Sequence, residues 1–186
     1  MYRIKTFDTI NSTSVFARKN LSDLADFDVI SANIQTNGHG QFERKWLSSD
    51  KNGGNCYISI VLKPKNIEYL GELTRYSSSI VSKTVEGYGL ETRLKYPNDV
   101  LIGEKKISGV LAESVFIGNV LKGVIVGIGV NLNLEGEEIN KIDTIATSIY
   151  NESGKVVDKN EFIERLLDNF FKDYEFFLKN GIGEIK

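Results

Sequence analysis

The stretch KYPNDVLIGEKKISGVLAE, residues 95–113, decides how the rest of the chain can be arranged. Within it, apolar runs lie on either side of a short polar turn at residues 103–105. Apolar runs around a glycine-containing turn are typical of a β-hairpin, and the second arm is predicted to continue to Phe116. The rest of the chain is therefore expected to be organised around this hairpin.

Polar side chains gather at one end of the predicted hairpin. Pro97 has no N–H group to donate to a sheet, and it places Asn98 and Asp99 in the turn that enters the first arm. Lys106 begins the second arm, and in a regular hairpin it lies close to Asp99. A carboxylate, an amide and an ammonium at one end suit either a solvated turn or a binding site, and these residues alone favour the turn.

Composition limits what such a cluster can be. The 186 residues, of which 41% are hydrophobic and 26% are charged, suffice for one core and predict a single domain over residues 1–186. The 23 basic and 25 acidic residues leave a net charge of −2, so no nucleic-acid partner is expected. The longest apolar runs are far shorter than the roughly 20 residues of a membrane span, so no membrane association is expected. Cys56 is the only cysteine, which excludes an internal disulfide and predicts a cytoplasmic protein.

Histidine and cysteine are too scarce for several catalytic mechanisms. A zinc site built from these residues needs three or four ligands, and the chain offers only His39 and Cys56. A Ser–His–Asp or Cys–His mechanism would have to use His39, which lies between two glycines in a segment unsuited to holding a base rigidly. Catalysis would therefore depend on lysines, arginines, carboxylates and backbone amides, groups that suit work on phosphates and acyl groups.

Hydrophobic periodicity predicts strands and helices on both sides of the hairpin. Further strands are expected at residues 2–7, 28–35, 56–62, 93–95 and 120–128. Helices are expected at residues 15–19, 67–88, 144–150 and 159–178, with N-caps at residues 11–14, Asn66, and Asp158 or Asn160. The predicted fold is an α+β domain with a single mixed, mainly antiparallel sheet and helices packed against it.

The interval between residues 36 and 54 has no periodicity and is punctuated by glycines. Loops of that length are uncommon in compact domains and are usually either functional or disordered. This one contains Trp46, the only tryptophan, next to Lys45 and close to Arg44. It is interpreted as a binding loop that orders over a ligand, with the alternative that Trp46 and Leu47 only anchor it to the core.

Several stretches of the chain, in the right order, resemble motifs of the catalytic domain of biotin protein ligases, also called biotin–acetyl-CoA-carboxylase ligases. Residues 95–99 (KYPND) and 105–113 (KKISGVLAE) resemble the family's Lys-Trp-Pro-Asn-Asp segment and the segment that follows it. Residues 35–46 (QTNGHGQFERKW) resemble its glycine- and arginine-rich biotin loop. Residues 12–13 (ST) stand where the family has Ser-Thr-Asn, and residues 127–131 (GIGVN) resemble its Gly-x-Gly-x-Asn.

This resemblance covers about residues 10 to 150 and implies the fold shared by class II synthetases and biotin and lipoate ligases. It also implies a two-step reaction, with biotin as substrate and ATP and Mg²⁺ as cofactors. Biotin and MgATP first give biotinyl-5′-adenylate and pyrophosphate. A lysine of the biotin carboxyl carrier protein, which belongs to acetyl-CoA carboxylase or a related carboxylase, then attacks the mixed anhydride.

The same resemblance implies roles for particular residues. Lys106 and Arg44 would be catalytic. The residues expected to bind biotin are Ser12, Thr13, Gln35, Gly38, His39, Lys106, Gly109 and Gly127. The residues expected to bind the nucleotide are Gln41, Arg44, Trp46, Asn98, Asp99, Lys106 and Asn131. Asp99 would also help to hold the Mg²⁺ that accompanies ATP.

The chain also departs from the family pattern. Gln41 stands where relatives usually have arginine, which removes a charge and a bidentate donor on the phosphate side of the adenylate. Relatives continue into a small SH3-like β-barrel after the last helix, and some carry an N-terminal winged helix that binds DNA. Neither of these domains is expected in this chain, and repressor activity is not expected.

Three functions are therefore considered. The first is a ligase that makes biotinyl-adenylate and transfers its biotinyl group. The second is a binding module or weakened paralogue that holds biotin or its adenylate, a hypothesis suggested by Gln41. The third is a lipoate or octanoate ligase or transferase, although Gln35 with Ser12 and Thr13 favours a polar ureido site over an aliphatic slot. A homodimer formed through sheet edges is implied by the resemblance alone.

Overall fold

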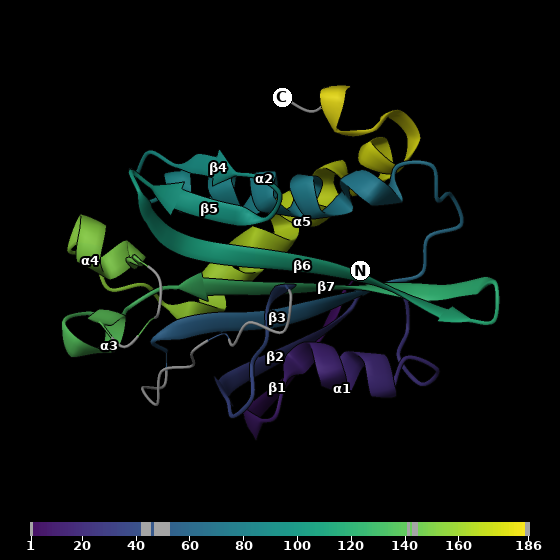
Figure 1. Cartoon of the computed structure of the whole chain (residues 1–186), viewed down its shortest axis with the longest axis horizontal. Coiled ribbons are helices and arrows are strands. Elements are labelled where there is room, and N and C mark those ends of the chain that lie inside the picture. The colour runs from purple at the N-terminus through teal and green to yellow at the C-terminus, as the bar shows by residue number, and fades with distance from the viewer. Residues whose placement is uncertain (1, 42–45, 47–52, 141, 143–144, 185–186) are drawn as a thin grey trace.

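The computed structural model describes residues 2–41, 46, 53–140, 142 and 145–184. At its centre is a seven-stranded sheet with the strand order β1-β2-β3-β7-β6-β5-β4 (Figure 1). The strands are β1 (Arg3–Ile10), β2 (Asp28–Gln35), β3 (Asn55–Leu62), β4 (Arg93–Lys95), β5 (Asp99–Ile102), β6 (Lys105–Ile117) and β7 (Val120–Asn131). β1 and β2 pair in parallel, and the other neighbouring strands pair antiparallel. The predicted α+β fold with a single mixed, mainly antiparallel sheet is confirmed.

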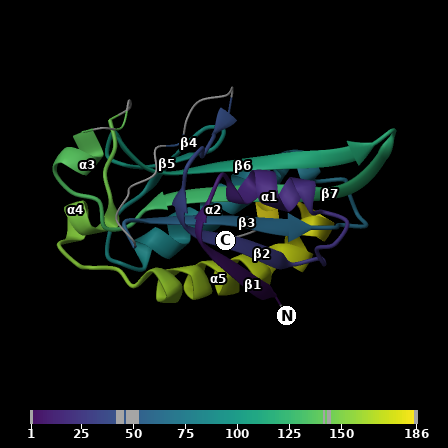
Figure 2. The ribbon, with the colours of Figure 1, turned by 90° about the horizontal axis from the view of Figure 1, so that it is seen from below.

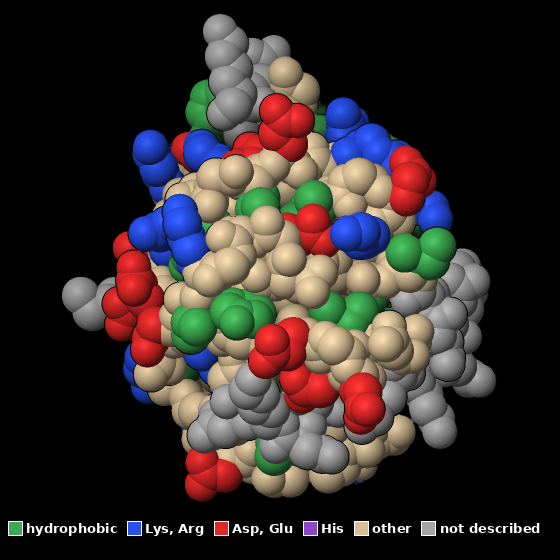
Figure 3. Space-filling model, turned by 90° about the vertical axis from the view of Figure 1, so that its left-hand side faces the viewer, with side chains coloured by type: hydrophobic (Ala, Val, Ile, Leu, Met, Phe, Trp, Pro, Cys, Tyr) green, Lys and Arg blue, Asp and Glu red, His purple; other side chains and the backbone are tan. Residues whose placement is uncertain are grey.

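Helices cover the two faces of the sheet unequally, as Figures 1 and 2 show. The long helices α2 (Leu73–Glu86) and α5 (Lys159–Asn180) pack on one face, and α1 (Thr13–Lys19) packs on the other. The short helices α3 (Glu137–Asn140) and α4 (Ile149–Ser153) lie together at one end of the sheet. Two 3-10 turns, at Leu70–Glu72 and Ile182–Glu184, precede α2 and follow α5. Basic and acidic side chains are interspersed on the face that carries α3 and α4 (Figure 3).

Strand alternation divides the apolar side chains between these two faces. In β3, the even-numbered residues from 56 to 62 join the large core under α2 and α5, whereas Val61 packs in a smaller core under α1. In β7, the even-numbered residues from 124 to 130 also join the large core. Gly127 and Gly129 therefore fall on the α1 face, where the absence of side chains lets other groups approach the sheet closely.

Most strand predictions agree with the structure, and the ranges 28–35 and 93–95 agree fully. The helix predicted over residues 67–88 begins later, at Leu73, after a 3-10 turn. Asn66 still stabilises the segment that leads into α2. Its Oδ1 accepts a hydrogen bond from Glu68 N (3.0 Å), and its Nδ2 donates one to Leu178 O (2.7 Å). The side chain thus stabilises a turn and the end of α5, and the helix starts one turn further on.

The helix predicted over residues 144–150 is wrong in its start. α4 begins at Ile149 because Ser148 is its N-cap, with Oγ accepting a hydrogen bond from Asn151 N (3.0 Å). The residues before it are extended, and Ala146 forms an isolated parallel bridge with Lys106 of β6. The short helix α3 is not among the helices predicted from the sequence.

Cys56 is buried in the large core, and burial raises the pKa of its thiol to about 12. The thiol is therefore protonated at neutral pH, and the side chain packs as a small apolar group. Among the helices in the described ranges, none is long and apolar enough to cross a membrane.

Candidate functional site

A cavity opens on the α1 face of the sheet, where β6 and β7 lie beside the N-terminus of α1. Its lining comes from the start of α1, the end of β2 and the residues after it, the β5–β6 hairpin and the centre of β7. The predicted site residues that line it are Ser12, Thr13, Gln35, His39, Gln41, Trp46, Asn98, Asp99, Lys106, Gly109 and Gly127. The fold therefore brings together groups that are up to 115 residues apart, from Ser12 to Gly127.

The β5–β6 hairpin places Lys106 beside Asp99, as the sequence predicted. Lys106 Nζ lies 2.7 Å from Asp99 Oδ1, and the two side chains are 24% and 22% exposed. Partial burial keeps water and salt from screening this pair fully, so the attraction is stronger than in an exposed ion pair. The ammonium is thus held at one wall of the cavity.

The sequence prediction assumed regular pairing of the hairpin, but the structure has a β-bulge there. The bulge turns the Lys106 side chain into the cavity. Lys106 and Gly109 are three residues apart, and a regular strand would place them on opposite faces. The register of β5 against β6 shifts between Val100 and Leu101, which accommodates one extra residue of β6. The Lys106 side chain consequently lies over Gly109, where an added Cβ would be only 3.3 Å from Lys106 Nζ.

Hydroxyl and amide groups form a second polar cluster at the start of α1. Ser12 is the N-cap of this helix, and its Oγ accepts a hydrogen bond from Val15 N (3.4 Å). Gln35 Oε1 accepts hydrogen bonds from the N–H (2.8 Å) and the hydroxyl (3.1 Å) of Thr13. Thr13 Oγ1 in turn accepts one from Ser59 Oγ (2.8 Å). The Gln35 oxygen is therefore oriented by two donors, both of them groups of Thr13.

Ser59 is a member of this cluster that the sequence prediction missed. It lies in β3 and is fully buried, and its Oγ also hydrogen-bonds to Ser14 Oγ (2.9 Å). A hydroxyl inside an apolar strand must find a hydrogen-bond partner, and that requirement is the signal that the sequence offers. The residues that line the cavity and were not predicted as site residues are Ser14, Gly40, Ile58, Val110, Leu111, Ile128 and Gly129.

The indole ring of Trp46 lies against two glycines of the sheet. A Cβ added at Gly129 would be 2.7 Å from Trp46 Cε2, and one added at Gly109 would be 2.9 Å from Cζ3. Lys106 Nζ lies 5.4 Å from the ring centroid, within the range of a cation–π interaction. Trp46 Nε1 is buried and has no hydrogen-bond partner in the described part of the chain. The ring therefore forms a wall of the cavity beside the ammonium and offers an unused donor there.

Three predicted site residues are not part of the described cavity lining. Gly38 lies behind Trp46, and its carbonyl accepts a hydrogen bond from Trp46 N (2.9 Å). Asn131 is buried, and its Nδ2 donates a hydrogen bond to Thr147 O (2.9 Å), which gives it a structural role. Arg44 lies outside the described residues. The ligand-binding roles of these three residues stay predictions, as do those of the residues that line the cavity.

Among the described residues that line the cavity, Asp99 is the only one with a carboxylate side chain. Within the described ranges, no group of three or more His, Cys, Asp or Glu side chains is arranged to hold a metal ion. Mg²⁺ bound to nucleotide phosphates keeps several waters and needs only one or two protein carboxylates. Within the described lining, a single aspartate therefore fits an ion that enters with a nucleotide.

Comparison with known proteins supports the sequence resemblance. Residues 6–131 match the biotin/lipoate A/B protein ligase family. The bifunctional ligase/repressor BirA of Bacillus spizizenii is 32% identical over 183 residues, which are 96% of this chain and 56% of the relative. The biotin–[acetyl-CoA-carboxylase] ligase of Paracoccus denitrificans is 29% identical over 170 residues, 86% of this chain and 68% of the relative. The chain thus spans little more than half the length of the BirA relative.

A solved structure gives the same result for the fold. The biotin protein ligase of Aquifex aeolicus in complex with biotin and ATP superposes with a TM-score of 0.85 at 31% identity. The match covers 100% of this chain and 76% of the Aquifex chain. Its extent includes the whole sheet, both long helices and the cavity described above. The chain belongs to the biotin/lipoate A/B protein ligase family, and its resemblance to the biotin protein ligases is confirmed.

Proposed function

We propose that this chain carries out the biotin protein ligase reaction, in which biotin and ATP give biotinyl-5′-adenylate and pyrophosphate. The biotinyl group then passes to a lysine of a biotin carboxyl carrier protein. The observation that carries the proposal is the Lys106–Asp99 ion pair, which shares a cavity with Thr13 and Gln35 of the hydroxyl–amide cluster. The names of the relatives, which are biotin and acetyl-CoA-carboxylase ligases, support this choice of substrate and acceptor.

Lys106 supplies the positive charge that the first step requires. A carboxylate oxygen of biotin attacks the α-phosphorus of ATP, and pyrophosphate leaves with the electrons of the broken P–O bond. Two anions have to approach each other, and an ammonium between them offsets their repulsion. Lys106 also stabilises the charge that builds on the α-phosphate oxygens. Asp99, 2.7 Å from Lys106 Nζ, keeps the ammonium oriented before the substrates bind.

The hydroxyl–amide cluster suits the ureido ring of biotin, which has one carbonyl and two N–H groups. Gln35 Oε1 is already occupied by Thr13, so its Nε2 presents donors for the carbonyl. The hydroxyls of Ser12 and Thr13 supply acceptors for the N–H groups. A purely aliphatic ligand would leave the remaining hydrogen-bonding capacity of these groups unused, and each donor or acceptor left without a partner costs roughly 1–3 kcal/mol. This cost favours biotin over lipoate or octanoate.

We assign the nucleotide to Trp46, Asn98 and Gln41, which line the same cavity. Trp46 offers an aromatic surface for the adenine side, and Asn98 offers an amide for hydrogen bonding. Arg44 is proposed to contact phosphate. Asp99 would hold the Mg²⁺ that accompanies ATP, and the ion, when bound, offsets the negative charge of the phosphates. Closure of the cavity over the adenylate would exclude water, which hydrolyses the anhydride.

The proposal also includes a cytoplasmic location, and it includes a carboxylase whose carrier protein supplies the acceptor lysine.

Two other functions remain as alternatives. A binding module would hold biotin or its adenylate without turnover, and Gln41 in place of arginine motivates this alternative. A lipoate or octanoate ligase would use the same fold, because the matched family includes both types of ligase.

Mass spectrometry of an acceptor domain tests the complete reaction. The protein is incubated with a biotin carboxyl carrier domain, ATP, Mg²⁺ and either biotin or lipoate. We expect biotin to be attached to a single lysine of the acceptor, and we expect no product with lipoate. Attachment of lipoate alone would support the second ligase type. Adenylate formation in the reaction mixture with no acceptor modification would contradict the transfer step.

Replacement of Gln41 with arginine is expected to slow the release of biotinyl-adenylate by about tenfold. A guanidinium adds a charge-assisted, bidentate hydrogen bond to the phosphate side, worth roughly 1.5–3 kcal/mol when well aligned. The half-time of adenylate retention on the protein after rapid gel filtration measures this effect. Gln41→Met, which removes the amide without adding charge, is the matched control, and equal retention in both variants would count against the role given to this position.

A further inference from the structure

Lys106 is held through its backbone by a segment that belongs to neither strand of the hairpin. Lys106 N donates a hydrogen bond to Ile145 O (2.8 Å), and Thr147 N donates one to Lys106 O (2.9 Å). These two bonds form the isolated parallel bridge between Lys106 and Ala146. The position of the Lys106 Cα, and therefore the place where its ammonium enters the cavity, depends on residues 145–147 being fixed.

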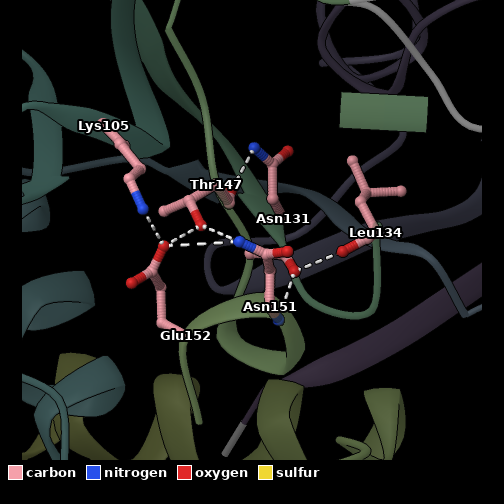
Figure 4. A network of polar contacts seen from close by, with 7 residues as sticks. Lys105, Asn131, Leu134, Thr147, Asn151 and Glu152 are labelled. Atoms are coloured by element: carbon pink, nitrogen blue, oxygen red, sulfur yellow. Dashed lines mark hydrogen bonds and ion pairs between the residues drawn. The ribbon is translucent and has the colours of Figure 1, made fainter. Parts of the chain in front are cut away.

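Thr147 is the residue through which this segment is fixed (Figure 4). It is fully buried, and its hydroxyl donates a hydrogen bond to Glu152 Oε1 (2.5 Å). Its carbonyl accepts the hydrogen bond from Asn131 Nδ2 at the end of β7. The next residue, Ser148, caps α4 and donates a hydrogen bond to Leu134 O (2.6 Å). The backbone beside Lys106 is thus attached both to β7 and to the carboxylate of α4.

Glu152 also binds the neighbouring lysine. Lys105 Nζ lies 2.8 Å from Glu152 Oε1, and the two side chains are 48% and 19% exposed. Hydrogen bonds from Lys105 and then from Thr147 lower the pKa of the Glu152 carboxyl, so it is ionised at neutral pH. The two adjacent lysines therefore have separate carboxylate partners on opposite sides of β6. Lys105 is turned away from the cavity toward Glu152, and Lys106 is turned into it toward Asp99.

We propose that Glu152 is a positioning residue for Lys106: through Thr147 it fixes the backbone bridge, and through Lys105 it keeps the second ammonium out of the cavity. This inference rests on the proposed ligase function, because the consequence that matters is the placement of the Lys106 charge at the reacting phosphate. A displacement of about 1 Å at such a group can cost on the order of 100-fold in rate. Glu152 is not among the described residues that line the cavity, so it should influence the chemical step and leave substrate binding largely unchanged.

Steady-state kinetics of biotin-dependent pyrophosphate exchange test the proposal in Glu152→Ala, Glu152→Gln and Thr147→Val. We expect Glu152→Ala to lower kcat between about 10- and 100-fold while KM for biotin changes less than about threefold. Glu152→Gln retains an oxygen that can accept from Thr147, and it should recover most of the loss. Thr147→Val removes only the hydroxyl from a buried site of the same shape and should also lower kcat. The matched control is Glu104→Ala, which breaks the exposed ion pair with Arg93 (2.9 Å) at the adjacent turn.

Amide hydrogen exchange of the ligand-free protein provides a readout that does not depend on activity. In Glu152→Ala, the N–H groups of Lys106 and Thr147 should exchange at least about tenfold faster, whereas the amides of β3 should be unchanged. Unchanged exchange at both amides would overturn the positioning role, as would a wild-type kcat in Glu152→Ala. A loss of exchange protection throughout the protein with loss of all activity would also overturn it, since the residue would then only stabilise the fold. Absence of biotin-dependent activity in the wild-type protein would instead refute the proposed function, and the amide measurement would still decide whether Glu152 anchors the bridge.

Discussion

Replacement of Lys106 with methionine is expected to lower the rate of biotin-dependent pyrophosphate exchange by about 100- to 1000-fold. Methionine keeps most of the apolar stem of the side chain and removes the ammonium, so the loss reports the charge and the hydrogen bonds that the ammonium supplies. The ammonium lies 2.7 Å from Asp99 Oδ1 and over Gly109, in a cavity where water screens it only partly. A partly desolvated charge at this place stabilises the developing phosphate charge far more than a charge in bulk water.

The matched control for this prediction is Lys122→Met in β7, a lysine that is exposed and lies outside the cavity lining. This control removes the same charge from the protein, and it should retain the wild-type rate. Asp99→Asn should give a smaller loss than Lys106→Met, because it leaves the ammonium in place but removes the partner that orients it. Wild-type exchange in Lys106→Met would exclude the central catalytic role assigned to this residue.

Addition of a methyl group at Gly129 is expected to displace the Trp46 indole and to lower the exchange rate by about tenfold or more. The new Cβ would lie 2.7 Å from Cε2 and 2.8 Å from Cζ2 of the ring, so the ring has to move. Forcing an atom into an occupied site costs roughly 1–3 kcal/mol. Trp46 is the only tryptophan of the chain, which makes its fluorescence a direct measure of this displacement.

In Gly129→Ala, the emission maximum should shift to longer wavelength, because the indole moves from the cavity wall toward water. Gly71→Ala is the control, since a Cβ at Gly71 meets nothing within 4 Å and its backbone is not in the left-handed region. The control should retain the wild-type emission and rate. An unchanged emission maximum together with an unchanged rate in Gly129→Ala would show that Trp46 is not a wall of the working site.

The hairpin at residues 95–113 shows how far the sequence alone could predict the site. Alternation and turn residues were enough to predict both arms, because each arm buries one face in the core. The proximity of Asp99 and Lys106 followed from the hairpin and was confirmed at 2.7 Å. The bulge that turns Lys106 over Gly109 was not predicted, since an extra residue in one strand changes the pairing without changing the composition of either strand.

Features that depend on contacts between distant segments could not be predicted from local patterns. The helix start near residue 144 was misplaced because residues 145–147 bond to the backbone of Lys106, a contact that local helix propensity cannot indicate. Ser59 was missed because its partners, Thr13 and Ser14, are more than 40 residues away. Local periodicity therefore predicted the elements, whereas the positions of the site residues required the tertiary structure.

Biotin-dependent exchange of labelled pyrophosphate into ATP by the wild-type protein tests the central claim most directly. The first step is reversible, so a site that forms biotinyl-adenylate must return label to ATP when biotin is present. We predict exchange that requires biotin, saturates with its concentration, is absent with lipoate or octanoate, and falls by about 100-fold or more in Lys106→Met. Exchange no faster than that of Lys106→Met, or exchange supported by lipoate in place of biotin, would contradict the account.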